Sequence, residues 1–170
     1  IFDYWSMPEL AKWVNGHRYD GGRLAPEQQA LRAYYARLLA LLNEPAFRDG
    51  EFIGLNGANN ANPRFGRLPG ESASGHWLYA YLRHDPASGQ TFLVVVNLHR
   101  SETLRDVRVQ FPTSALDALG VKGGNEMVVF ADRLTTTTLV PLKTNGKQLM
   151  DSGLTIPQVP ALSALYLELS

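Results

Sequence analysis

The stretch HWLYAYLRHDPASGQTFLVVVNLH, residues 76–99, predicts the centre of the fold. Residues 77–82 are rich in aromatic side chains, which suit a pleated, half-buried strand. Residues 85–89 (DPASG) supply a turn, because proline fixes φ and glycine admits positive φ. Residues 92–96 (FLVVV) are apolar without alternation, which indicates a strand covered on both faces. We therefore expect a central strand over 91–98, with all three of its valines largely buried.

Several more short strands are expected around this hairpin. Val107, Val109 and Phe111 alternate with polar residues, which is typical of a strand with one dry face. Other candidates are residues 51–55, 126–130, 137–140 and 165–169. Asn145-Gly146 is a tight-turn signal. The two prolines at 157 and 160 favour an edge strand or a strand start. Short strands separated by turns predict an antiparallel β-sandwich of two sheets.

The N-terminal part has helical patterns instead. Ser6 and Glu9 fit a capping box before a short helix that Asn15-Gly16 would end. A longer helix is expected over 26–43, starting at a proline and carrying one apolar stripe. The stripe consists of Leu31, Tyr34, Tyr35, Leu38 and Leu42, and it needs a surface to pack against. Glu44-Pro45 should stop this helix.

These patterns divide the chain into three parts. Residues 1–45 form a helical segment, 46–75 a connecting loop with a first strand, and 76–170 the β-sandwich. The connector contains an asparagine-rich run at 56–63. Such a run suggests glycan attachment or metal ligation on one interpretation, and an ordinary long surface loop on the other, which we favour.

The overall composition is that of a globular protein. Of 170 residues, 45% are hydrophobic and 19% are charged, which excludes a disordered chain. The formal net charge is zero and basic residues are scattered, so no nucleic-acid or anionic-lipid partner is expected. No apolar run approaches the roughly 20 residues of a membrane span, so we expect a soluble protein of undetermined location. The chain opens on Ile1 without an initiator methionine and is expected to be a fragment.

The sequence alone predicts no catalytic residue, no metal site and no cofactor. A glycosidase needs two facing carboxylates, one of them kept protonated. The available acids lie mostly in turns and caps: Asp3, Glu9, Asp20, Asp85, Asp106, Asp132 and Asp151. The four histidines lack metal-ligand spacing, although His76 or His84 could pair with His99 across two strands. Cysteine is absent, which rules out thiolate chemistry.

Aromatic residues gather near the N-terminus. Tyr4, Trp5, Trp13 and Tyr19 could form a platform for stacking sugars, or they could pack this segment onto a neighbour. We favour packing, since large aromatic side chains are mostly burial anchors.

Three stretches resemble the C-terminal region of α-amylase-type glycoside hydrolases, family 13. Residues 31–52 (LRAYYARLLALLNEPAFRDGEF) are similar to the last helix of the catalytic barrel and its exit. Residues 77–102 (WLYAYLRHDPASGQTFLVVVNLHRSE) resemble the first hairpin of the C-terminal domain, with Arg83 and Asn97 at matching places. Residues 154–169 (LTIPQVPALSALYLEL) resemble the closing strand.

The resemblance implies a Greek-key β-sandwich preceded by the last barrel helix. It also implies a partner, the catalytic (β/α)8 barrel of a parent chain acting on α-glucans. The family's catalytic acids lie upstream, and a barrel needs about 250 residues, so none is carried over onto this chain.

Two alternative functions remain open for the sandwich. One is a carbohydrate-binding module in which Trp5, Trp77 or Tyr81 stacks on α-glucan rings, a hypothesis that a row of solvent-facing aromatics on one sheet would support. The other is a general interaction domain unrelated to sugars. Because the helix at 26–43 would lack its barrel neighbours, we also expect the fragment to form a homodimer.

Overall fold

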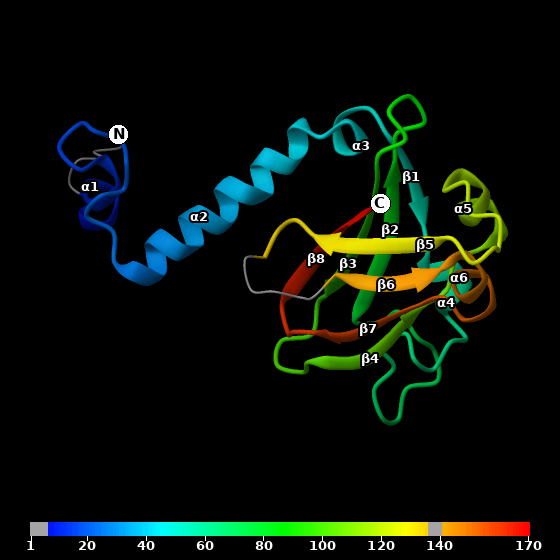
Figure 1. Cartoon of the computed structure of the whole chain (residues 1–170). Coiled ribbons are helices and arrows are strands. Elements are labelled where there is room, and N and C mark those ends of the chain that lie inside the picture. Colours follow the sequence, from blue (N-terminus) through cyan, green and yellow to red (C-terminus); the bar gives the residue numbers. More distant parts are fainter. Residues whose placement is uncertain (1–6, 136–140) are drawn as a thin grey trace. The chain divides into compact units, whose positions relative to one another are not determined.

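The computed structural model describes residues 7–135 and 141–170. The chain forms two compact units, Ile1–Leu41 and Leu42–Ser170 (Figure 1). Within the described ranges, no helix combines the length and apolar character that a membrane crossing requires.

The described residues of the first unit, 7–41, form two α-helices. Helix α1 (Pro8–Val14) follows Met7 as its N-cap and ends at Asn15, which adopts a left-handed conformation. The predicted capping residue Ser6 lies outside the described residues. Helix α2 (Pro26–Ala40) starts with Pro26 in its first turn, as expected, and continues as a short 3-10 turn over Leu41–Asn43. The Gln28 side chain joins the two helices by donating to Glu9 at 2.7 Å.

The second unit consists of two antiparallel sheets with short helices. The larger sheet has six strands in the order β1-β2-β3-β8-β5-β6, and the smaller pairs β4 with β7. The strands are β1 (Glu51–Gly54), β2 (Leu78–His84), β3 (Thr91–Asn97), β4 (Leu104–Val109), β5 (Met127–Asp132), β6 (Leu142–Asn145), β7 (Leu154–Val159) and β8 (Ser163–Leu169). The short helices are α3 (Pro45–Arg48), α4 (Asn56–Asn59), α5 (Thr113–Ala118) and α6 (Gly146–Ser152). This mainly-β arrangement is what the strand pattern predicted.

Strand β3 occupies the centre of the larger sheet, as its unbroken apolar run predicted. Leu93 and Val95 face the main core, while the Phe92 ring lies 4.9 Å from the Phe47 ring of α3 on the opposite face. Val94 and Val95 are fully buried, but Val96 is only partly buried. Val96 is therefore the least buried of the three valines that were expected to be largely buried.

One hydrophobic core joins the two sheets. It takes Leu82, Val95 and Leu167 from the larger sheet, and Val107 and Ile156 from the smaller one. Burying apolar side chains from both sheets against each other is the main stabilising term of such a layered fold. Pro157 lies in β7, which pairs on one side only, so its missing N–H costs no ladder bond there.

One local expectation comes out differently, and another cannot be compared. Asn145-Gly146 is not a hairpin turn: the Asn145 side chain accepts a bond from the Gln148 backbone at 2.8 Å and caps α6. The predicted strand at 137–140 lies outside the described residues. The first strand expected in the connector at 51–55 is present as β1, which pairs in register with β2.

Candidate functional site

The predicted sugar-stacking residues do not come together. Trp5 lies outside the described residues. Trp77 precedes β2, in contact with two histidines, whereas Tyr81 lies within β2 among other aromatic rings. The neighbours of Trp77 are polar or charged side chains, whereas those of Tyr81 are aromatic rings.

Trp77 is enclosed by polar neighbours. The His76 ring stacks parallel on it at 4.4 Å, and the His99 ring meets it edge-on at 4.7 Å. Its indole N–H donates to Glu71 at 2.8 Å. Since His76 covers one face of the indole, a sugar could stack there only by displacing it. The role of Trp77 in sugar binding stays a prediction.

Glu71 organises this cluster. It accepts bonds from the Leu68 backbone and from Trp77, and its carboxylate lies 3.3 Å from His76 Nδ1. The Leu68 hydrogen bond is the main cause that holds the Glu71 pKa below its usual range, so the carboxylate is ionised at neutral pH. His99 Nδ1 accepts from two backbone N–H groups. Among the described residues, no acidic and histidine side chains form a group that could hold a metal ion.

Tyr81 lies in the middle of a row of aromatic rings. Its ring centroid is 5.0 Å from that of Phe52 on β1 and 5.7 Å from that of Tyr79 on β2. Phe52 is 53% exposed and Tyr79 is 42% exposed, while Tyr81 between them is half-buried. Burial raises the pKa of the Tyr81 hydroxyl, which therefore stays protonated and able to donate a hydrogen bond. We call Phe52, Tyr81 and Tyr79 the aromatic row.

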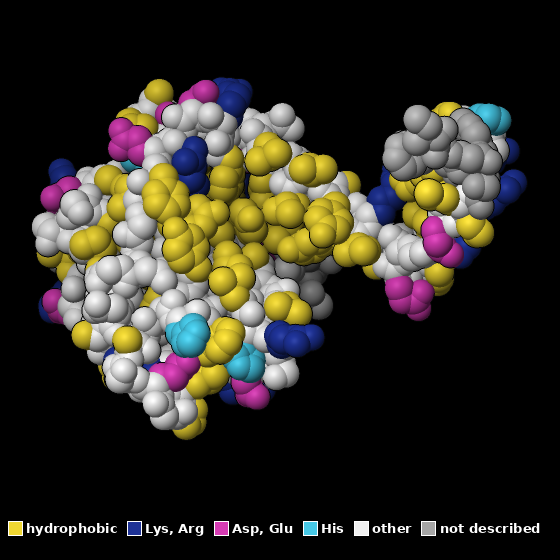
Figure 2. Space-filling view, turned by 180° about the vertical axis from the view of Figure 1, so that it is seen from behind, with side chains coloured by type: hydrophobic (Ala, Val, Ile, Leu, Met, Phe, Trp, Pro, Cys, Tyr) yellow, Lys and Arg dark blue, Asp and Glu magenta, His cyan; other side chains and the backbone are white. Residues whose placement is uncertain are grey.

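The aromatic row lies on the face of the sheet opposite the main core. Residues along a strand alternate between faces, and Ala80 and Leu82 point into the core. Figure 2 shows hydrophobic side chains gathered across one face of the larger unit. The single-strand pattern predicted Tyr81 as a candidate, but Phe52 could be added only with the register of β1 on β2.

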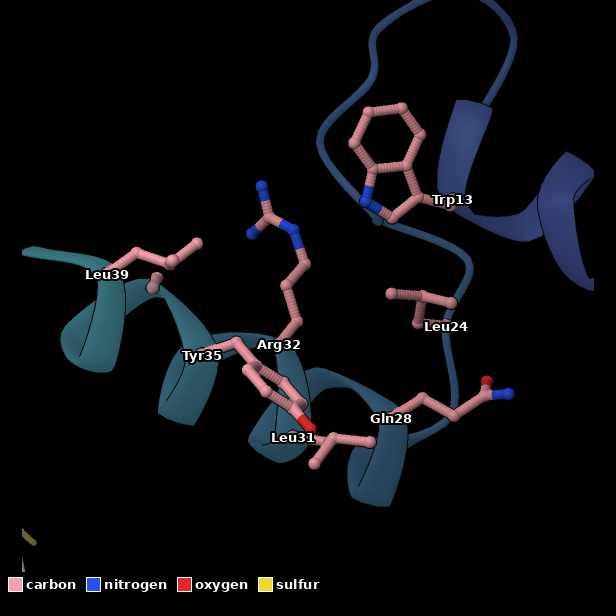
Figure 3. A pocket seen from close by; sticks show the side chains of 8 residues that line it. Trp13, Leu24, Gln28, Leu31, Arg32, Tyr35 and Leu39 are labelled. Atoms are coloured by element: carbon pink, nitrogen blue, oxygen red, sulfur yellow. The ribbon is translucent and has the colours of Figure 1, made fainter.

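A second apolar surface is a groove of about 450 Å³ within the first unit. Trp13 and Leu24 lie on one side and the side chains of α2 on the other, with Arg32 extending between them (Figure 3). The α2 residues of the groove are Gln28, Leu31, Arg32, Tyr35, Ala36 and Leu39. This open groove combines leucine side chains with the rings of Trp13 and Tyr35, and its lining contains no carboxyl group or histidine for acid–base chemistry.

The asparagine-rich loop has a structural role. Asn59 is fully buried, and its side chain donates to the Gln110 carbonyl and accepts from the Gln110 N–H, at 2.9 and 2.8 Å. The Asn62 side-chain amide makes a similar contact, because it donates to the Arg108 carbonyl. These bonds tie the loop to the end of β4 and use the amides that a ligand would need.

Every carboxyl group whose pKa is shifted favours the ionised form, so none of these groups keeps a proton to donate at neutral pH. The pKa values of Glu9, Asp20, Glu71 and Asp85 are lowered, mainly by hydrogen bonds from Lys12, Asn15, the Leu68 backbone and Ser88 respectively. A glycosidase acid requires the opposite shift.

Comparison with known proteins returns no relatives: no family model, no curated protein and no solved structure matches this chain.

Proposed function

We propose that this chain is the C-terminal part of an α-amylase-type glycoside hydrolase of family 13, acting on α-glucans. In this proposal α2 is the last helix of the catalytic (β/α)8 barrel, and the two sheets form a non-catalytic Greek-key β-sandwich that packs on that barrel. The order of elements supports it, because a helix is followed by antiparallel strands in two sheets.

The observation that carries the proposal is the exposure of the apolar side chains of α2 within the first unit. None of its residues is buried, and Leu31, Tyr35 and Leu39 are 56%, 53% and 59% exposed. Isolated helices shorter than about 12–15 residues are marginal in water, and in proteins most helix stability comes from packing an apolar face. We expect such a helix in a larger protein, where other elements pack against its apolar side chains.

The residues that carry the family resemblance also have structural tasks here. Arg83 donates from Nε to the Ala46 carbonyl and from Nη2 to the Phe47 carbonyl, each at 3.0 Å, and so fixes α3 on the sheet. Asn97 is fully buried and donates to the Val159 carbonyl at 3.0 Å, which ties the end of β3 to β7. Because these contacts hold α3 and β7 on the larger sheet, Arg83 and Asn97 help to define the domain, which supports the resemblance.

The lowered carboxyl pKa values support the non-catalytic role. A retaining glycosidase needs a protonated acid close to an ionised nucleophile. The described carboxyl groups whose pKa is shifted all favour the ionised form.

Two measurements test the proposal. The reading frame upstream of Ile1 should encode a (β/α)8 barrel, and the product of that longer frame should release reducing ends from starch. The purified 170-residue chain should release none above a heat-inactivated control. A frame without a barrel, or hydrolysis by the 170-residue chain itself, would refute it.

A further inference from the structure

A cavity of about 460 Å³ lies in the loop that leads into β2. Its whole lining comes from residues 70–76, and the loop glycines Gly70 and Gly75 both adopt positive φ. Glu71 and His76 are the only ionisable side chains of this lining. A short loop thus presents one carboxylate and one imidazole to the same cavity.

The negative charge of Glu71 has no lysine or arginine partner among the described residues. The carboxylate accepts from the Leu68 N–H and from the Trp77 indole, both at 2.8 Å. The Leu68 bond is the main cause that keeps the Glu71 pKa below its usual range, so the charge is present at neutral pH. His76 Nδ1 lies 3.3 Å from Oε1, but a neutral imidazole leaves the charge uncompensated.

The position of His76 shows which chemistry fits this place. Its ring is parallel to the Trp77 indole within 6°, with ring centroids 4.4 Å apart, while its Nδ1 faces Glu71. A flat, nitrogen-bearing group therefore already lies against an aromatic face and beside a carboxylate. Both neighbours favour a positive charge on such a group, because aromatic faces attract cations and carboxylates pair with them.

The His76 side chain can be displaced, whereas the Trp77 indole is fixed. The His76 side chain is 65% exposed, and an ion pair at such a surface position contributes little to stability. The indole is held by its hydrogen bond to Glu71 and by the edge-on ring of His99 at 4.7 Å. A ligand that binds the indole and the carboxylate better than an imidazole does can therefore take the place of His76.

A guanidinium or amidinium group meets both requirements of this place. Such a group is flat, carries a positive charge at neutral pH and has N–H donors in its own plane. It can lie parallel to the indole and donate to Glu71 at the same time, since guanidinium groups stack on aromatic faces. A lysine ammonium is a compact point charge and cannot stack in this way.

We infer that Trp77 and Glu71 form a binding site for a planar cation of the guanidinium or amidinium class, which His76 occupies in the free protein. The ligand replaces the His76 ring on the indole, donates to the Glu71 carboxylate and extends into the cavity of the 70–76 loop. This site does not depend on the proposed function, because it uses no residue of α2 and no sugar.

The test follows the Trp77 indole N–H by NMR while the full 170-residue chain is titrated with benzamidine. The absence of this resonance from Trp77→Phe identifies it. Benzamidine and N-acetylargininamide should both cause saturable shifts. Benzamide, the neutral isostere, and N-acetyllysinamide, which has the same charge without the plane, should bind much more weakly. No saturable shift with either planar cation would overturn the site, and so would equal binding of benzamide or of the lysine compound.

Two substitutions test the roles of the side chains. Glu71→Gln keeps an acceptor for the Leu68 N–H and the indole but removes the charge. The affinity for benzamidine should then fall roughly tenfold, the low end for a hydrogen bond to a charged group. His76→Ala uncovers the indole and should raise the affinity about two- to fivefold. Unchanged affinity in Glu71→Gln would overturn the site, and binding no tighter in His76→Ala would overturn the role of His76 as its occupant.

Glu102→Gln is the matched control. Glu102 is exposed, its backbone N–H donates to His99 Nδ1 at 2.9 Å, and its carboxylate bonds none of the described residues. This variant should bind benzamidine like the parent chain, and urea unfolding should show that all variants are folded. A loss equal to that of Glu71→Gln would mean that only the summed charge near Trp77 matters, which would overturn the site.

The source of the cation is decided by a further comparison. Tighter binding of N-acetylargininamide than of agmatine, a free guanidinium compound, would identify an arginine side chain of a partner protein as the ligand. The reverse order would identify a free small molecule. Either order supports the site, because both compounds carry the same planar cation.

Discussion

The ring centroid of Phe47, in α3, lies 4.9 Å from that of Phe92, in β3. This contact covers the outer face of the central strand with a four-residue helix that Arg83 holds in place. Phe47→Ala removes that cover and should lower the free energy of unfolding by about 1–3 kcal/mol, below the roughly 3–5 kcal/mol of a fully buried phenylalanine. Urea denaturation measures it. Phe52→Ala, at an exposed ring, should cost less than about 1 kcal/mol, and equal losses would contradict the covering role of α3.

The valines of β3 should differ in their contribution to stability. Val95 is fully buried in the main core, whereas Val96 is partly buried on the opposite face. Val95→Ala should therefore cost about 1–3 kcal/mol through lost burial and a residual cavity. Val96→Ala should cost less than half of that. The same urea experiment compares them, and a Val95→Ala variant as stable as the parent would argue against a central position for β3.

Patterns along the sequence predicted the elements whose cause is local. The alternation of β4 and β8, the unbroken run of β3 and the proline at the start of α2 each reflect a property of adjacent residues. Asn145-Gly146 misled the prediction because asparagine serves both tight turns and helix N-caps, and only the bond from Gln148 distinguishes the two.

Features that depend on distant residues could not be predicted. Asn59 bonds the backbone of Gln110, far along the chain, so its burial left no mark on the local pattern. The aromatic row needs the register that places Gly54 opposite Tyr81 and Phe52 beside it. Tyr81 was predicted from its strand, but its neighbour on β1 was not. The sequence around Trp77 did not predict that the His76 ring would stack on its indole.

The capping role of Asn145 gives a prediction that separates the two interpretations. Asn145→Ala should cost about 0.5–2 kcal/mol, because the N–H of Gln148 loses its acceptor. Asn145→Ser should keep most of the stability, since serine caps helices equally well. A hairpin turn would need positive φ at this position and would not be rescued by serine. Thermal unfolding of the three proteins measures the difference, and failure of serine to rescue would contradict the cap.

The turn between β2 and β3 should make stability depend on acid pH. The Ser88 hydroxyl, with the backbone N–H groups of Ala87 and Ser88, holds the Asp85 pKa below its ordinary value of 3.8. A carboxyl group with a lowered pKa contributes stability that is complete above its unfolded-state pKa and is lost as the pH falls through the folded-state value.

The parent chain should therefore lose stability more steeply than Asp85→Asn as the pH is lowered from about 5 to about 3. Urea midpoints at several pH values provide the measurement. Asp117→Asn, at an exposed aspartate of α5, is the control and should follow the parent chain. Identical pH profiles for Asp85→Asn and the parent would show that the turn hydrogen bonds do not distinguish the charged from the neutral carboxyl.

The uncovered face of α2 should make the isolated chain associate with itself. Leu31, Tyr35 and Leu39 are all more than half exposed, and they border the groove with Trp13 and Leu24. If the proposed barrel normally covers this face, the chain on its own exposes apolar surface that a second copy can bury, most simply around a two-fold axis. Sedimentation velocity should then show a dimer whose population grows with concentration.

Charge placed on this face should prevent the association. Leu31→Lys combined with Leu39→Lys would bury two unpaired ammonium groups in the contact, which costs far more than it gains. Ala33→Lys is the control, because Ala33 is exposed on α2 but does not line the groove. The double variant should sediment as a monomer with the β-sheet signal in circular dichroism unchanged, and Ala33→Lys should dimerise like the parent. A parent chain that stays monomeric at high concentration would mean that α2 is soluble without a partner, which would remove the main support for a missing barrel.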